Sequence, residues 1–214
     1  NFVAYDVSEG AVELAKNLAK KRGLRNLTYR VADLNTLVHP ENSYDVVFAS
    51  QSLHHIESLE FYLDQVERTL KPNGLFIINE FVGPNQFQWT DLQVRHAQLL
   101  LETIPERYRQ IIQGHGLKAE IARPSIEFMN QIDPTEAIRS AEIIPQVSMR
   151  FETIEKIDFG GTLLQLVLAD IVGNFSDTPE DRAILQNLFD EEQRLLQSGE
   201  LESDFTLMVM RNKK

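Results

Sequence analysis

Two apolar stretches decide the fold of this 214-residue chain: Tyr-Asp-Val-Val-Phe-Ala at 44–49 and Leu-Phe-Ile-Ile at 75–78. Short continuous apolar runs are typical of strands in a parallel sheet that helices cover on both faces. Between them, Ser58 is a good N-cap for a helix whose apolar residues recur every three to four positions. Strand, helix and strand in this order predict a right-handed βαβ unit.

The same alternation precedes residue 44. Residues 2–5 predict a strand that stops at Asp6, and Ser8 can cap a helix that Gly23 ends. Residues 26–31 predict the next strand, which leads to Asp33. The alternation predicts an α/β fold with a doubly wound, mostly parallel sheet.

Pro72 and Asn73 predict a turn at 71–74, just before the second apolar stretch. After residue 80 the pattern becomes mainly helical. We expect strands over 151–159 and 205–210, and helices over 88–101, 106–113, 134–144, 163–172 and 179–197. The chain is therefore expected to be one domain over 1–214, with helical lid insertions at 81–150 and 160–200.

Composition limits the classes of function. The net charge is −11, so a nucleic-acid substrate is not expected. No apolar run approaches the ~18 residues of a membrane span, and the start of the sequence lacks a secretory signal. The absence of Cys is compatible with the cytoplasm, which we expect as the location. The apolar helix over 163–172 is a candidate homodimer interface, although burial within the fold is the commoner fate of such a helix.

Polar groups follow each of the predicted strands, where ligands bind in open α/β sheets. The Asp6 carboxylate can accept both hydroxyls of a ribose, in NAD as well as in other nucleosides. The Asp33 carboxylate can accept an adenine amine while the amide of Leu34 reaches a ring nitrogen. The alternatives are a helix-capping role for Asp6 and a turn-forming role for Asp33.

After the third strand come Ser50 and Gln51, where small polar residues let the backbone approach a ligand. The histidines His54 and His55 follow; they are either functional or simply one surface ring and one partly buried ring. The sequence contains no Cys and no His-Glu-x-x-His pattern, so we expect no metal site.

Five segments in this order resemble class I, Rossmann-like S-adenosylmethionine-dependent methyltransferases: Asp6-Val-Ser, Ala32-Asp-Leu, Tyr44-Asp-Val-Val-Phe-Ala-Ser, Leu53-His-His-Ile and Arg68-Thr-Leu-Lys-Pro-Asn-Gly-Leu. The resemblance implies S-adenosyl-L-methionine as the cofactor. It implies cofactor-binding roles for six residues: Asp6 and Val7 at the ribose, Asp33 and Leu34 at the adenine, and Ser50 and Gln51 near the methionine moiety.

The same family has a central first strand and a Gly-x-Gly-x-Gly turn, which we expect before Asn1. The chain as given is therefore expected to lack that strand and turn. It is also expected to bind cofactor poorly and to be inactive by itself.

The resemblance implies methyl transfer to a small-molecule or sugar-type acceptor, at oxygen or nitrogen. Candidates for a general base are His54, His55 and Glu80, and candidates for the acceptor pocket are Trp89, Arg95 and Arg107. Glu80 can equally be an ion-pair residue and Trp89 a core residue. The alternatives to a methyltransferase are a NAD-dependent or nucleotide-sugar oxidoreductase, although no Tyr-x-x-x-Lys pair supports it, and a non-catalytic interaction module.

Overall fold

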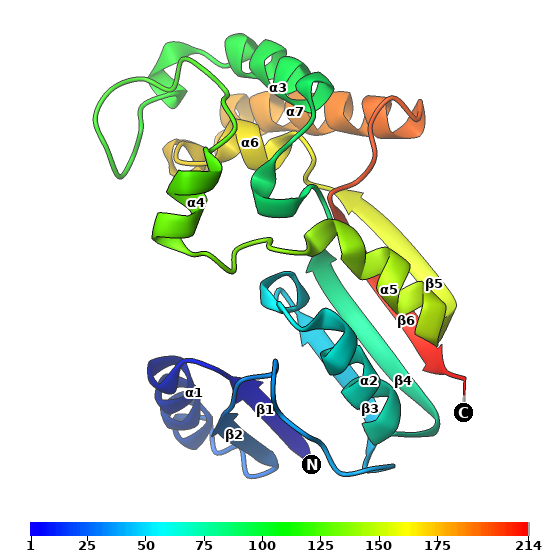
Figure 1. Cartoon of the computed structure of the whole chain (residues 1–214). Coiled ribbons are helices and arrows are strands. Elements are labelled where there is room, and N and C mark those ends of the chain that lie inside the picture. The colour runs from blue at the N-terminus through cyan, green and yellow to red at the C-terminus, as the bar shows by residue number, and fades with distance from the viewer. Residues whose placement is uncertain (214) are drawn as a thin grey trace.

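The computed structural model describes residues 1–213, and its strands form two neighbouring sheets (Figure 1). The first sheet pairs β1 (Phe2–Asp6) in parallel with β2 (Leu27–Val31). The second has the order β3-β4-β6-β5, with bounds Tyr44–Ser50, Leu70–Phe81, Phe205–Asn212 and Phe151–Gly160. β3 and β4 are parallel, whereas β6 is antiparallel to both β4 and β5. The predicted α/β class is confirmed, and the sheet is mixed because its C-terminal strands run antiparallel.

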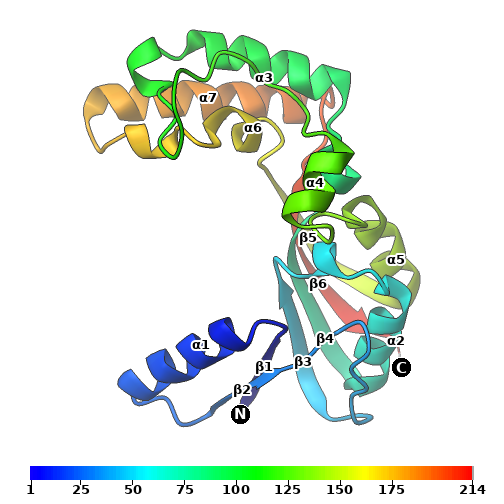
Figure 2. The same ribbon diagram turned by 60° about the vertical axis from the view of Figure 1, so that its left-hand side comes forward.

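The edges of β1 and β3 face one another without a backbone ladder among the described residues (Figure 2). Side chains join them instead: the hydroxyls of Tyr5 and Tyr44 are 3.3 Å apart, and both rings meet the edge of His39. On β3, Phe48 remains 61% exposed.

Two cores stabilise the fold. The first lies under α2 (Leu59–Thr69) and α5 (Ile143–Arg150), which pack on the larger sheet. The second lies within a helical module, defined as α3 (Asp91–Thr103), α6 (Leu164–Leu168) and α7 (Pro179–Gln197). Figure 2 shows this module at the opposite end of the molecule from β1. None of the described helices is long and apolar enough to cross a membrane.

Helix ends follow the sequence signals in part. The helix α1 (Glu9–Lys21) begins where Ser8 Oγ accepts from the amide of Ala11, and Gly23 follows it at φ +66°. Ser58 precedes α2 as predicted, but its side chain makes no capping hydrogen bond. Its backbone amide donates to Asn35 instead.

Several predicted elements in the insertions, and the turn predicted at 71–74, were wrong. Of the helix expected over 163–172, only Leu164–Leu168 is α-helical. The stretch 106–113 forms only a short 3-10 helix, Glu106–Tyr108, before Gln110 pairs with Leu117. The helix expected over 134–144 begins at Ile143, and the seven-residue α4 (Ile126–Ile132) was missed. The expected turn at 71–74 is a bulge within β4, with Asn73 at φ +60°. These segments are short, so their form depends on neighbours rather than on local periodicity.

Candidate functional site

The two predicted nucleoside-binding residues, Asp6 and Asp33, lie at the same edge of the small sheet, at the ends of β1 and β2. Asp6 pairs with Val31 in the ladder, and the amide of Ala32 donates to the Asp6 carbonyl over 3.0 Å. Asp33 is therefore the next residue at the same edge. Both carboxylates are exposed to solvent, as a ligand-binding pair must be before it binds.

Each carboxylate is also held by its own loop. Asp6 Oδ1 accepts from the amide of Ser8 over 2.7 Å, and Asp33 Oδ1 accepts from the backbone and side-chain amides of Asn35. For Asp33 this is the turn-forming role that the sequence left open, whereas the helix-capping role considered for Asp6 belongs to Ser8. Each turn uses only the Oδ1 atom of its aspartate. The turns therefore fix both side chains and leave the Oδ2 atoms of Asp6 and Asp33 to a ligand.

The other predicted cofactor residues differ in their surroundings. Gln51 has φ +50° and donates through both its backbone and side-chain amides to the carbonyl of Asn79, so the turn after β3 is tied to β4. Ser50 and Val7 are exposed, whereas Leu34 packs against the first core.

Glu80 and His54 form a buried pair at the ends of β4 and β3. Glu80 is fully buried, and its Oε2 lies 2.8 Å from His54 Nδ1. Its Oε1 accepts from the backbone amides of Ser52 and Leu53 over 2.6 and 2.9 Å. A buried carboxylate needs such partners. The pair therefore fixes the turn after β3 and leaves Nε2 as the outward nitrogen of His54.

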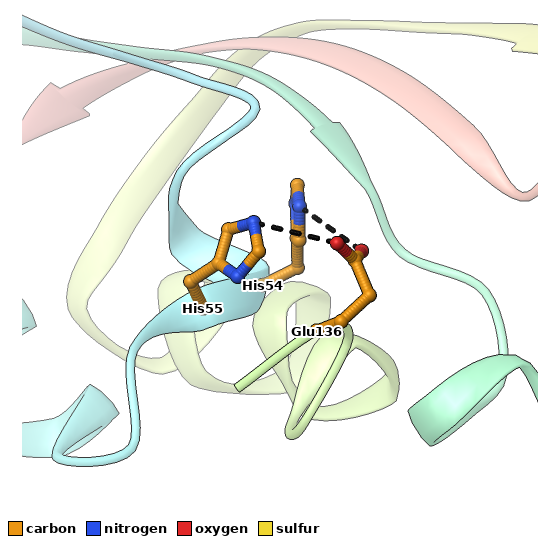
Figure 3. A group of neighbouring side chains, drawn as sticks. All are labelled: His54, His55 and Glu136. Atoms are coloured by element: carbon orange, nitrogen blue, oxygen red, sulfur yellow. Dashed lines mark ion pairs between the residues drawn. The ribbon is translucent and has the colours of Figure 1, made fainter. Parts of the chain in front are cut away.

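A loop from the insertion completes this cluster (Figure 3). Glu136 places its carboxylate 3.6 Å from His54 Nε2 and 3.7 Å from His55 Nε2. The amide of Ile138 donates to the carbonyl of His54, which holds the loop in place. Glu136 was not predicted from the sequence, because a carboxylate distant in the chain gives no local signal.

The predicted acceptor-pocket residues lie in and around the helical module, without contact to the His-Glu cluster among the described residues. Trp89 is buried there and stacks on Phe87 at 5.1 Å. Arg95 is exposed on α3. Arg107 pairs with Glu180 and lies over the ring of Tyr108. The structure thus gives Trp89 and Arg107 contacts that stabilise the module.

A buried carboxylate connects the helical module with the sheet. Asp204 precedes β6, and its Oδ2 accepts from the side chain of Gln93 on α3 over 3.0 Å. Its backbone carbonyl accepts from the amide of Val82, just after β4. Burial raises the pKa of Asp204 to about 7, although the hydrogen bond from Gln93 opposes this shift.

Sequence comparisons place residues 1–78 in a family described as "Methyltransferase domain". The uncharacterised YafE of Escherichia coli is 33% identical over 38% of this chain and 40% of its own length. A sterol 24-C-methyltransferase of Gibberella zeae is 30% identical over 53% of this chain and 30% of its own. The chain thus spans less than half the length of these two relatives.

Solved structures share the fold. A provisionally assigned sarcosine dimethylglycine methyltransferase from Galdieria sulphuraria matches 98% of this chain and 68% of its own, with a TM-score of 0.53 and 13% identity. The [4+2]-cyclase SpnF matches 98% of this chain and 65% of its own, with a TM-score of 0.52 and 15% identity. Proteins with different names share this architecture, so fold alone does not assign the chemistry. Residues 1–78 thus match the methyltransferase domain family, and the chain shares the α/β fold of these solved structures.

Proposed function

We propose that the complete protein transfers a methyl group from S-adenosyl-L-methionine to a small-molecule or sugar-type acceptor, at oxygen or nitrogen. The match of residues 1–78 to a methyltransferase domain supports the reaction class. The net charge of −11 favours a small acceptor over a nucleic acid. A location in the cytoplasm and assembly as a homodimer stay predictions.

The observation that carries the proposal is the adjacency of Asp6 and Asp33 at the ends of β1 and β2. One carboxylate suits the ribose hydroxyls and the other suits the adenine amine, so together they fit a single adenosine. Their Oδ1 atoms are occupied by backbone amides, and this fixes the direction in which Oδ2 accepts. Val7, Leu34, Ser50 and Gln51 complete the proposed cofactor site around this pair.

The cofactor, when bound, supplies a methyl group on a sulfonium; the sulfur–carbon bond breaks as the acceptor–carbon bond forms. The residues of the chain contribute mainly orientation and exclusion of water. A hydroxyl or amine acceptor must also lose a proton. His54 and His55 remain the candidates for accepting it. Glu80, the third candidate from the sequence, is fully buried behind His54, and we propose that it orients that ring. Trp89, Arg95 and Arg107 stay proposed acceptor-side residues.

Ligand titration of the complete protein tests this function. We expect S-adenosylhomocysteine to bind and to raise the melting temperature, whereas NAD has no effect, because a ligand of the native state stabilises it by mass action. Asp6→Asn and Asp33→Asn should each weaken binding roughly 10- to 100-fold, the equivalent of one charge-assisted hydrogen bond. Asp190→Asn, on the exposed side of α7, is the matched control.

The alternatives give different results in the same titration. Binding of NAD alone would replace the methyltransferase by an oxidoreductase. A complete protein that binds neither ligand would instead support a non-catalytic interaction module.

A further inference from the structure

We propose that His54, His55 and Glu136 form a binding site for one divalent transition-metal ion, with Zn²⁺ as the best-matched probe. This inference concerns binding and does not rest on methyl transfer; with an ion bound, the two Nε2 atoms are ligands and do not act as general bases. The three residues each offer one ligand atom, and these atoms all lie within 4.8 Å of one another. Figure 3 shows the two rings turned toward the same carboxylate.

The distances suit a single ion between the three side chains. Ligands about 2.0–2.2 Å from a tetrahedral zinc lie about 3.4 Å from one another. The Glu136 carboxylate is 3.6 Å from His54 Nε2 and 3.7 Å from His55 Nε2. The ring centroids are 4.3 Å apart. Small side-chain rotations therefore bring all three atoms to coordination distance.

The opposite ring nitrogens are already held, as they are in metal sites. A metal-bound histidine normally gives its other nitrogen to a carboxylate, a hydroxyl or a carbonyl, which fixes the tautomer and the ring orientation. His54 Nδ1 lies 2.8 Å from Glu80 Oε2, and His55 Nδ1 lies 3.1 Å from Thr135 Oγ1. Asp133 holds that threonine, because its Oδ1 accepts from Thr135 Oγ1 over 2.7 Å. Both rings thus direct Nε2 toward Glu136.

Charge and exposure also favour a cation. Glu80, Asp133 and Glu136 surround the two rings, so the cluster is negative when the imidazoles are neutral. Glu80 is fully buried, whereas the side chains of His55 and Glu136 are 34% and 28% exposed. An ion can therefore enter from the solvent side, while the buried carboxylate behind His54 strengthens that ligand.

The ligand set points to the class of metal. Imidazole nitrogens suit zinc and neighbouring transition metals, whereas magnesium and calcium prefer oxygen ligands. Two histidines and one carboxylate leave a fourth position for water or a substrate oxygen, as in catalytic zinc sites. His54 and His55 follow β3, as do Ser50 and Gln51 of the proposed cofactor site.

Calorimetric titration of the purified, metal-stripped protein with Zn²⁺ tests the proposal, together with the visible spectrum of the Co²⁺ form. We expect one ion per chain and the absorption of a tetrahedral cobalt site with nitrogen and oxygen ligands. His55→Gln and Glu136→Gln should each lower the affinity at least 10-fold. Thr135→Val, which removes only the partner of a ligand, should lower it by about 10- to 100-fold. Mg²⁺ should not compete.

The controls are His115→Gln and Glu127→Gln, which alter an exposed histidine and an exposed carboxylate outside the cluster. They should bind Zn²⁺ as the parent does, and the circular dichroism of every variant should match it. Absence of binding would overturn the proposal and leave the cluster as ion pairs only. Binding that is equally strong in the His55→Gln and Glu136→Gln variants would also overturn it, because it would show that the ion binds elsewhere.

Discussion

The backbone amide of Ser58 donates a hydrogen bond of 2.8 Å to Oδ1 of Asn35. The side-chain amide of the same Asn35 donates to Asp33 Oδ1 over 2.9 Å. One asparagine thus connects the loop after β2 with the beginning of α2. The predicted adenine-binding carboxylate and the turn that carries the histidines are held in one framework by this residue.

Replacement of Asn35 by alanine tests that framework. Asn35→Ala removes the acceptor of the Ser58 amide and a donor to Asp33, so we expect a loss of about 1–2 kcal/mol in the free energy of unfolding. Chemical denaturation measures the loss. Asn17→Ala is the control, because Asn17 is exposed on α1 and bonds only within that helix. Equal free energies of unfolding for the two variants would show that the hydrogen bonds of Asn35 do not stabilise the fold.

Replacement of Glu80 tests whether its buried carboxylate holds the turn after β3. Glu80→Ala leaves the amides of Ser52 and Leu53 without their acceptor, and His54 without its partner. At about 1–3 kcal/mol for each unsatisfied buried group, we expect a loss of several kcal/mol in unfolding free energy. Glu80→Gln keeps one carbonyl oxygen in place and should lose less. The two denaturation curves would coincide if the turn did not depend on this acceptor.

The raised pKa of Asp204 predicts a pH dependence of stability. In the unfolded chain an aspartate releases its proton near pH 3.9, whereas burial raises the pKa of Asp204 to about 7 in the fold. Between these values the folded state holds one more proton, so the contribution of this group to stability falls as pH rises. The free energy of unfolding falls by at most about 1.4 kcal/mol per pH unit through this one group.

The variant Asp204→Asn cannot ionise, so we expect it to lose this component of the slope while keeping an oxygen that can accept from Gln93. Denaturation midpoints between about pH 5 and 8 should converge for the parent and the variant as pH falls, with the parent losing more stability toward pH 8. Parallel profiles would mean that Asp204 titrates as an ordinary exposed aspartate.

Two glycines with positive φ allow the cost of a steric clash to be measured apart from the cost of backbone strain. Gly161 has φ +74°, and a Cβ there would lie 2.4 Å from the ring of Phe205. Gly199 has φ +72°, but a Cβ there would meet nothing within 4 Å. We expect Gly199→Ala to cost about 1 kcal/mol for the positive φ, and Gly161→Ala to cost about 1–3 kcal/mol more. Thermal melts of both proteins measure the difference, and equal melting temperatures would contradict the predicted clash.

The sequence by itself determined the elements with strong local signals. The strands around residues 46 and 77 were predicted because short continuous apolar runs are typical of parallel strands, although Val46 and Phe48 of β3 stay exposed. The helix over Pro179–Gln197 was predicted with its observed bounds from its amphipathic pattern, and in the structure Thr178 caps it. Adjacency of Asp6 and Asp33 also followed from sequence, since neighbouring parallel strands end at one edge.

Only the tertiary structure decided how distant segments meet. The short α4 and the late beginning of α5 lack a strong local signal, because helices of seven or eight residues are marginal on local propensity alone; α5 packs on α2 and β5. The buried bond from His54 to Glu80 and the approach of Glu136 join residues that no sequence spacing relates. Periodicity reports which face of a segment is buried, but the partner of a side chain is set by the way the segments pack.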